Sequence, residues 1–361
     1  MSERPAFIPD WCSPPGETVA DMLDEKGMSL AAFASSIERS LSFVPELIAG
    51  RAEISSDLAS RLAKVLGSSK RFWINREAQY REALARLDQS VQSPDAAEWL
   101  KELPVKDMVK AGWITPGPTP RDRVRSCLRF FGVPTVAAYR EAYGDLLQQV
   151  AFRKSAAFES QPGAVAAWLR HGERIGAAID CKAWNKDAFT QILVPIRKLT
   201  RERNPHIFIS ELKRLCAQCG VAIVVLKAPA GCRASGAVRT LPLNRRLMLL
   251  SFRHLSDDHF WFTFFHEAGH LVLHGDRPLI LEGDSSESED SEVEANTFAA
   301  NQLIPQEYRS AMMRLPADPR AIMRFARDID ISRGIVVGQL EHAGRLRHGQ
   351  LSFLKQRFAW E

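Results

Sequence analysis

One continuous apolar segment, residues 258–274, constrains the fold of this chain more than any other feature of its sequence. The segment is long enough for a helix of roughly four to five turns. Its large apolar residues fall on every side of such a helix, from Trp261 and Phe265 to Leu271 and Val272. Because a helix that is apolar all round is buried, this segment is expected to lie at the centre of a core.

Three polar residues interrupt this apolar segment in the pattern HExxH, namely His266, Glu267 and His270. Residues four apart lie about one helical turn apart, so both imidazoles project from the same face and can hold one metal ion. Buried imidazoles need partners, and a metal ion supplies one. A catalytic zinc site takes a third protein ligand and keeps one open position. Glu267 can then take a proton from the metal-bound water and pass it to a leaving amine.

The third ligand is expected to be a carboxylate on the helix that follows the motif, over about 292–303. Ala295, Phe298 and Ala299 form one face of that helix at helical spacing. Glu292 lies three residues before Ala295 and therefore on the same inward face, whereas Glu294 lies about 100° away. Glu292 is the predicted ligand, with Glu294 as the alternative.

Residues around the motif carry further expectations. Gly269 is costly inside a helix and would let another backbone or a substrate approach closely. His274 is too far along the helix for an easy third ligand, so it is expected to support a ligand or to end the helix. Asp257 and Asp258 are expected to cap the start of the helix.

The overall composition excludes several classes of protein. With 361 residues, 45% hydrophobic and 25% charged, the chain has the composition of a globular protein and not of a disordered one. No apolar run reaches the ~18 residues of a membrane-spanning helix, and residues 1–17 do not resemble a secretory signal. Six cysteines in a chain of this length do not indicate a disulfide framework. A cytoplasmic protein without membrane contact is expected.

Charge is distributed unevenly along the chain. The net charge of +5 results from −2 over residues 1–90, +10 over residues 91–240 and −3 over residues 241–361. A basic surface suits nucleic acid or an acidic partner, but the same charges are also typical of a solvated helical exterior.

The hydrophobic pattern predicts a mainly α protein with an α+β C-terminal domain that contains a small sheet. Three domains are predicted, over 10–90, 95–215 and 216–361. The acidic stretch 282–294 is expected to be a loop that becomes helical near its end. The predicted elements are four or five short helices within 16–66, a helix at 72–87, a mostly helical region at 95–215, strands at 221–226, 236–241 and 247–252, and helices at 292–303, 305–314, 318–328 and 333–343.

Residues 29–50 have the spacing of a helix-turn-helix, in which the second helix reads DNA. Arg39 and Arg51 are the candidate phosphate contacts, and Ser42 is a candidate contact from the second helix. Two features weaken that interpretation, because Glu38 occupies a turn position that usually holds glycine and Pro45 lies inside the second helix. The same motif can instead serve to form a homodimer or to dock a partner.

Residues 220–305, with HEAGHLVLH followed by ExxANxFAA and LIP, resemble the ImmA/IrrE family of zinc metallopeptidases. The resemblance extends to WFTFFHE upstream and IVVGQLEHAG downstream. It implies a zincin-like, zinc-dependent endopeptidase domain in which His266, His270 and Glu292 bind the metal and Glu267 is the catalytic acid and base. In that family such domains cut a repressor and so release transcription.

Residues 14–87 resemble the Cro/repressor fold in its HigA-like antitoxin version. The two resemblances together imply a DNA-binding transcriptional regulator that hydrolyses a peptide bond in a regulatory protein. The alternative is a non-proteolytic regulator, or an antitoxin that binds a toxin, whose zinc domain is sensory or structural. The expected partners are thus operator DNA and either a protein substrate or a toxin.

Overall fold

The computed structural model describes residues 14–359 with short gaps, and the described residues form two compact units. The first unit comprises residues 1–100 and 116–142, and the second comprises residues 101–115 and 143–361. The predicted helical region 95–215 is thus shared between them. The gaps lie at residues 49, 92, 153–160, 275–278 and 282–288.

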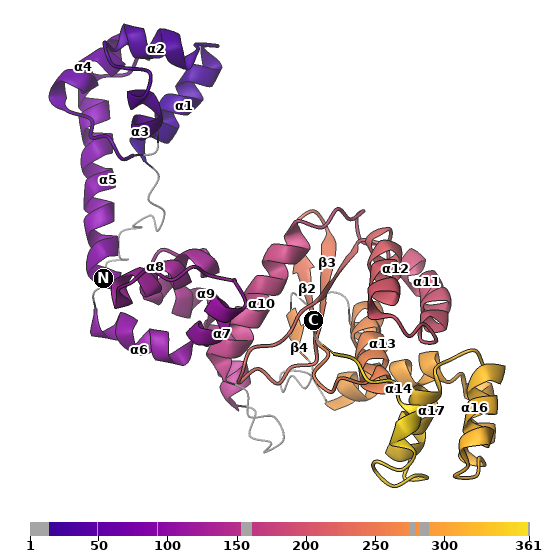
Figure 1. The fold of residues 1–361 in the computed structure, drawn as a ribbon. Coiled ribbons are helices and arrows are strands. Elements are labelled where there is room, and N and C mark those ends of the chain that lie inside the picture. Colours follow the sequence, from indigo (N-terminus) through magenta and orange to yellow (C-terminus); the bar gives the residue numbers. More distant parts are fainter. Residues whose placement is uncertain are drawn as a thin grey trace, which may run out of the picture. The chain divides into compact units, whose positions relative to one another are not determined.

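The first unit begins with a small bundle of short helices (Figure 1). Its core consists of apolar residues that recur at helical spacing, among them Val19, Phe33, Leu47 and Leu62, all less than 3% exposed. Side chains of Ser29 and Ser55 cap two of the helices by accepting a backbone N–H. The helices are α1 (Pro15–Glu25), α2 (Leu30–Ser36), α3 (Phe43–Ile48), α4 (Ser56–Val65) and α5 (Lys70–Val91).

Four short helices before Leu66 therefore match the lower of the two predicted numbers. The rest of the first unit packs the rings of Trp99, Phe131 and Tyr139 against one another at centroid distances of 4.7 to 6.2 Å. These rings come from α6 (Pro94–Glu102), α8 (Pro120–Phe131) and α9 (Val136–Phe152).

The second unit is built around a four-stranded sheet with the strand order β1-β3-β2-β4. β1 and β3 are parallel, whereas β2 is antiparallel to both β3 and β4. The strands are β1 (Val221–Val225), β2 (Gly236–Leu241), β3 (Arg245–Leu250) and β4 (Leu279–Leu281). The first three match the predicted strands, and β4 is an element that the hydrophobic pattern did not predict.

Helices cover both faces of this sheet (Figure 1). On one face, α10 (Pro162–Ala177) approaches closely because Gly172 and Gly176 lie against Leu249 and Leu247. On the other face, Met248 and Leu250 pack in the core that surrounds α13 (Asp257–Leu273). Alternate residues of β3 thus face opposite layers, as expected for a buried strand.

The remaining helices of the second unit are α7 (Val105–Lys110), α11 (Lys186–Leu199), α12 (Pro205–Ala217), α14 (Glu289–Leu303), α15 (Gln306–Met313), α16 (Pro319–Asp328), α17 (Arg333–His342) and the 3-10 turn η1 (Ser352–Leu354). Of these, α11, α14 and α17 pack against α13, the helix that carries the HExxH pattern. The prediction of a mainly α chain with an α+β C-terminal region is therefore confirmed. None of the helices in the described ranges is both long enough and apolar enough to cross a membrane.

Candidate metal centre

Helix α13 is buried along almost its whole length, and this burial positions His266, Glu267 and His270. Trp261, Phe264 and Phe265 are fully buried on its apolar sides. The close neighbour of α13 is α14, and Gly269 lies at their contact. A Cβ atom at position 269 would lie 3.1 Å from Cα of Ala295, so the glycine lets the second helix approach.

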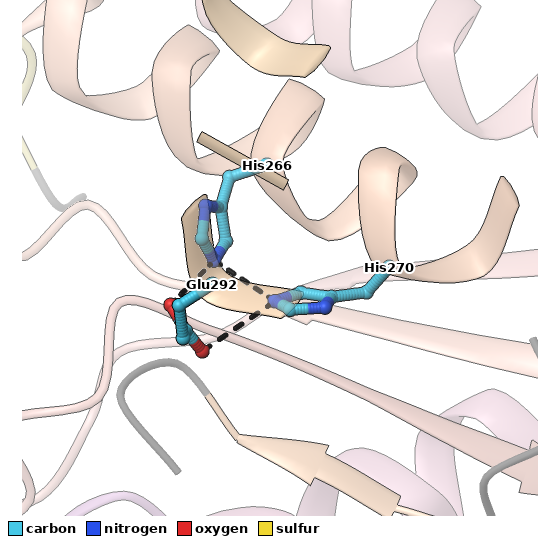
Figure 2. A group of neighbouring side chains, drawn as sticks. All are labelled: His266, His270 and Glu292. Atoms are coloured by element: carbon cyan, nitrogen blue, oxygen red, sulfur yellow. Dashed lines mark hydrogen bonds and ion pairs between the residues drawn. The ribbon is translucent and has the colours of Figure 1, made fainter. Parts of the chain in front are cut away.

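This approach brings a carboxylate of α14 to the two imidazoles of α13 (Figure 2). The Nε2 atoms of His266 and His270 lie 3.0 Å apart. The carboxylate of Glu292 lies 3.5 Å from Nε2 of His266 and 3.7 Å from Nε2 of His270. Both imidazoles are at most 3% exposed. The three predicted ligand residues thus converge, from two helices, on a common point.

Two imidazole nitrogens and a carboxylate oxygen are a donor set suited to a divalent transition metal. In each imidazole the nitrogen that faces the other two ligands is Nε2. Two nitrogen lone pairs 3.0 Å apart in a buried site repel each other unless a proton or a cation lies between them. The residues present therefore fit a metal ion, and the group is one that can hold it.

The outward nitrogens of both imidazoles contact side chains that orient the rings. Nδ1 of His266 lies 3.1 Å from the amide oxygen of Asn296, which only accepts, so this nitrogen donates. Nδ1 of His270 lies 3.3 Å from Nδ1 of His274, whose Nε2 lies 2.9 Å from a carboxylate oxygen of Glu294. A neutral His274 that donates to Glu294 accepts from His270. Both ligand rings then keep their Nε2 lone pairs for a metal ion.

Glu292 lies next to both His266 and His270, whereas Glu294, the alternative ligand, reaches His270 only through His274. It contacts His274, which is the C-terminal capping residue of α13. This arrangement follows from the helical period, because Glu294 lies on a different side of α14 from Glu292.

Glu267 is fully buried on the side of α13 that faces the sheet. Its carboxylate lies against Gly236, the first residue of β2, where a Cβ atom would be 2.3 Å from Oε1 of Glu267. A side chain at position 236 would therefore displace the carboxylate. Glu267 directly follows His266 in the chain, so the two side chains leave α13 about 100° apart.

The prediction that Asp257 and Asp258 cap α13 was wrong. Ser256 is the N-cap residue, and its side chain makes no capping hydrogen bond. Asp257 instead accepts hydrogen bonds from the backbone N–H of Gln356 at 2.9 Å and from the hydroxyl of Ser332. Both carboxylates are buried and are committed to tertiary contacts, which the local sequence does not reveal.

The buried network continues through Lys355. Its ammonium group lies 2.7 Å from a carboxylate oxygen of Asp258 and 2.6 Å from one of Glu341. Burial alone would raise the pKa of Asp258, but the hydrogen bonds from Lys355 and Ser256 outweigh it and hold that pKa below its usual value. Burial raises the pKa of Asp257 to about 6, and the negative charge of the neighbouring Asp258 adds to this effect. The network ties the start of α13 to α17 and to the C-terminal segment.

The candidate DNA contacts lie in the first unit, on or near α3. Arg51 forms a two-pronged ion pair with Glu46, with both N–O distances at 2.7 Å. The guanidinium of Arg39 lies 3.6 Å from Asp57 and over the ring of Phe43. Ser42 is exposed, and its hydroxyl lies 2.9 Å from that of Ser40.

The two sequence features that weakened the helix-turn-helix interpretation have local explanations. Glu38 adopts a φ of +53°, so the turn between α2 and α3 has the left-handed backbone that usually selects glycine. Pro45 is the third residue of α3, within the first turn, where a backbone N–H has no partner inside the helix. Pro45 therefore removes no hydrogen bond of α3.

Comparison with known proteins gives matches for both parts of the chain. Residues 220–337 match the peptidase M78 family, described as the IrrE N-terminal-like domain. The uncharacterized HTH-type transcriptional regulator YddM of Escherichia coli K12 is 32% identical over 77 residues, which cover 21% of this chain and 80% of YddM.

Two solved structures are also similar to this chain over a short stretch. One is a putative antidote protein of a plasmid maintenance system from Nostoc punctiforme, with 36% identity over 20% of this chain and 79% of that protein. The other is an addiction module antidote protein of the HigA family from Coxiella burnetii, with 32% identity over the same shares. Both have a TM-score of 0.19.

The family match and the match to YddM agree with the geometry of the two units. The stretch shared with YddM is the N-terminal helix-turn-helix, and the family match contains α13, α14 and the ligand group. The chain therefore belongs to the helix-turn-helix regulators of the YddM type and joins that module to an IrrE N-terminal-like domain.

Proposed function

We propose that this protein is a transcriptional regulator whose C-terminal domain is a zinc-dependent endopeptidase acting on a regulatory protein. The observation that supports this most is the convergence of His266, His270 and Glu292, together with the buried carboxylate of Glu267 on the same helix as the two imidazoles. The match to the peptidase M78 family supports the same activity.

Zinc is the proposed metal because two imidazoles and one carboxylate, with a position left open, are a common catalytic zinc donor set. When bound, zinc supplies Lewis acidity, which polarises a carbonyl group and makes a water molecule more acidic. Asn296 and the His274–Glu294 pair hold the two imidazoles in the tautomer that this binding requires.

Glu267 is the proposed acid and base. Its carboxylate accepts a proton from the attacking water and then donates it to the amine that leaves when the peptide C–N bond breaks. Two features of the structure favour that role. Burial removes competing solvent from the carboxylate, and Gly236 leaves it the space it occupies next to β2.

The direct test compares the full-length protein with Glu267→Gln, which keeps the shape of the side chain but not its basicity. Both proteins are assayed for zinc by elemental analysis and then incubated with a proteome-derived peptide library. Mass spectrometry of the products identifies every new terminus, whichever peptide in the library is cleaved. Glu307→Gln, a change of an exposed glutamate on α15, is the matched control.

The wild type and Glu307→Gln are expected to bind zinc and to generate the same new termini. Glu267→Gln is expected to bind zinc and to generate termini about a hundredfold to ten-thousandfold more slowly, because general acid–base catalysis typically contributes that much. If the wild type binds zinc but cleaves no peptide, the proposed metal site stands and the proposed endopeptidase activity is refuted.

We also propose that the helix-turn-helix binds DNA upstream of its own gene, with Arg39, Ser42 and Arg51 as contacts. The similarity to a transcriptional regulator supports this. Each lost phosphate contact lowers the dependence of log K on log salt by about 0.9. The variant Arg39→Gln/Arg51→Gln should thus flatten this dependence by almost two relative to the wild type in a fluorescence anisotropy titration. An unchanged slope would show that neither arginine contacts a DNA phosphate.

The alternative is a non-proteolytic regulator or HigA-like antitoxin that binds a toxin and uses its zinc domain for sensing or structure. The ion pairs of Arg39 and Arg51 with acidic side chains favour it, because paired arginines attract phosphate less strongly. On this alternative, Glu267→Gln would regulate its promoter like the wild type, and no peptide would be cleaved by either protein.

A further inference from the structure

A cavity of about 350 Å³ lies in the second unit and contains none of the candidate metal ligands. Its walls come from the chain between α11 and α12, from one side of α16, from the start of α17 and from the C-terminal segment. Small-molecule sites in proteins commonly occupy about 300–1,000 Å³. The cavity therefore has the volume for a ligand of modest size.

Among the described residues, the lining includes no acidic side chain but four arginines: Arg201, Arg203, Arg327 and Arg333. Arg201 is paired with Asp330, and Arg327 lies 3.5 Å from Asp328. Within the described part of the chain, Arg203 and Arg333 have no carboxylate oxygen within 4.0 Å of their guanidinium groups. Like charges that share a cavity repel one another, and an anion between them removes that cost.

Arg333 is held ready for such an anion. Its Nε atom donates to the backbone carbonyl of Leu354 at 3.2 Å, and its Nη1 atom lies 3.8 Å from the sulfur of Met323. A fixed guanidinium loses little side-chain freedom on binding, and its planar fork matches phosphate oxygens.

The lining also has an apolar part, formed by Met323, Ala326, Ile331 and Leu354. A purely inorganic anion would leave this surface exposed to water. A ligand with an apolar or aromatic part beside its anionic group would cover both kinds of wall, as small-molecule sites usually do.

The cavity also shares residues with the network that holds α13. Ser332 and Gln356 line it, and both hydrogen-bond to Asp257, the first residue of that helix. The side-chain amide of Gln356 donates to the backbone carbonyl of Arg203. A ligand in the cavity therefore rests on the segment that fixes the start of α13.

We propose that this cavity binds a small phosphorylated molecule, with its phosphate between Arg203 and Arg333 and its apolar part against Met323 and Leu354. The proposal is independent of the peptidase activity, because no candidate catalytic residue lines the cavity. It concerns a free ligand of this chemistry and not a macromolecule.

Isothermal titration calorimetry of the full-length protein tests the proposal with three probes: adenosine 5′-monophosphate (AMP), inorganic phosphate and adenosine. AMP is expected to bind, phosphate to compete with it, and adenosine to bind at least about tenfold more weakly, because it lacks the charge-assisted hydrogen bonds. AMP is also expected to raise the melting temperature, since it binds the folded state alone.

The variant Arg203→Gln is the main test, because no described contact uses the Arg203 side chain and folding should be unaffected. It is expected to weaken AMP binding by about tenfold. Arg203→Lys keeps the charge but loses the planar fork of the guanidinium, so its affinity for AMP should lie between those of the wild type and of Arg203→Gln. Arg324→Gln is the matched control, since Arg324 lies on α16 outside the cavity lining. It should bind AMP like the wild type.

Equal affinity of the wild type and Arg203→Gln for AMP would overturn the proposal. Failure of both AMP and phosphate to bind the wild type at millimolar concentration would do the same. A third outcome is binding of duplex DNA or of an acidic peptide that Arg203→Gln abolishes, while AMP does not bind. That result would also refute a small-molecule site, because it would assign the arginines to a macromolecular surface.

Discussion

Ion pairs occur in both units of this protein, but their surroundings differ. Arg51 and Glu46 of the helix-turn-helix pair at 2.7 Å with side chains that are 63% and 49% exposed. Lys355 and Asp258 of the C-terminal unit also pair at 2.7 Å, but their side chains are 9% and 8% exposed. The same chemical contact is thus made once in water and once inside the protein.

This difference separates charges that can change partner from charges that cannot. An exposed pair is worth little, so Arg51 can leave Glu46 for a phosphate at small cost. A buried pair stabilises little over apolar residues, but removal of one partner strands a charge in the interior. The N-terminal arginines are therefore suited to reversible binding, and the buried network is suited to holding α13 in place.

The largest difference in the free energy of unfolding is expected when one partner is removed from each of these two pairs. Lys355→Met is expected to lower the free energy of unfolding of the C-terminal unit by about 3–5 kcal/mol, because Asp258 and Glu341 lose their shared cation. Arg51→Gln should leave the free energy of unfolding nearly unchanged, because this pair is exposed. Chemical denaturation followed by circular dichroism measures both. Equal effects of the two variants would show that burial does not distinguish these pairs.

The pH dependence of stability should reveal the other buried carboxylate at the start of α13. The pKa of Asp257 is about 6 in the folded protein and near 3.9 when unfolded. Between these values the folded state binds more protons, so this group lowers the free energy of unfolding as pH rises from about 4 to 6. The loss amounts to about 3 kcal/mol, complete above pH 6.

Asp257→Asn removes this contribution, so the difference in stability between wild type and variant should depend on pH within that window and be constant above it. Urea titrations at several pH values measure the difference. A difference that is flat across the window would mean that Asp257 stays ionised when buried. Arg324→Gln is the control here, since arginine does not titrate in this range and the variant should add no pH dependence.

A smaller effect is expected at the contact between β2 and the catalytic candidate. Gly236→Ala places a Cβ atom on the carboxylate of Glu267, so cleavage is expected to slow by about tenfold to a hundredfold through misplacement of that group. Zinc content should not change, because the ligand atoms lie elsewhere. Gly144→Ala is the control, since a Cβ atom there meets nothing within 4 Å. Loss of zinc in Gly236→Ala would show that the substitution disturbs the whole helix.

Most of what is local in this fold could be predicted from the sequence. The spacing of His266 and His270 on one helix and the inward face of Glu292 both follow from the period of 3.6 residues. The strands β1 and β3 were recognisable because Val221–Val225 and Leu247–Leu250 are continuous apolar runs. The three-residue strand β4 is too short to show any period.

Contacts between residues far apart in the sequence could not be predicted. Asp257 and Asp258 have the local pattern of capping residues, yet their partners Gln356 and Lys355 lie nearly one hundred residues away. Gly236 is an ordinary glycine at the start of a strand until Glu267 is placed beside it. A single sequence holds no signal that links these positions.

The acidic stretch 282–294 was predicted to be a loop at first and a helix near its end. Residues 289–294 belong to α14, while 282–288 lie outside the described residues. Within the described part, the helix begins before Glu292. Because the helix starts before it, Glu292 has a helical backbone, and its side chain projects toward α13.

The central claim is that His266, His270 and Glu292 share one zinc ion. Anomalous diffraction at the zinc absorption edge, from crystals of the full-length protein supplied with zinc, tests it most directly. The account predicts one strong peak about 2.0–2.2 Å from both Nε2 atoms and from a carboxylate oxygen of Glu292. Absence of a peak between these side chains in zinc-saturated crystals, or a peak bound elsewhere, would contradict it.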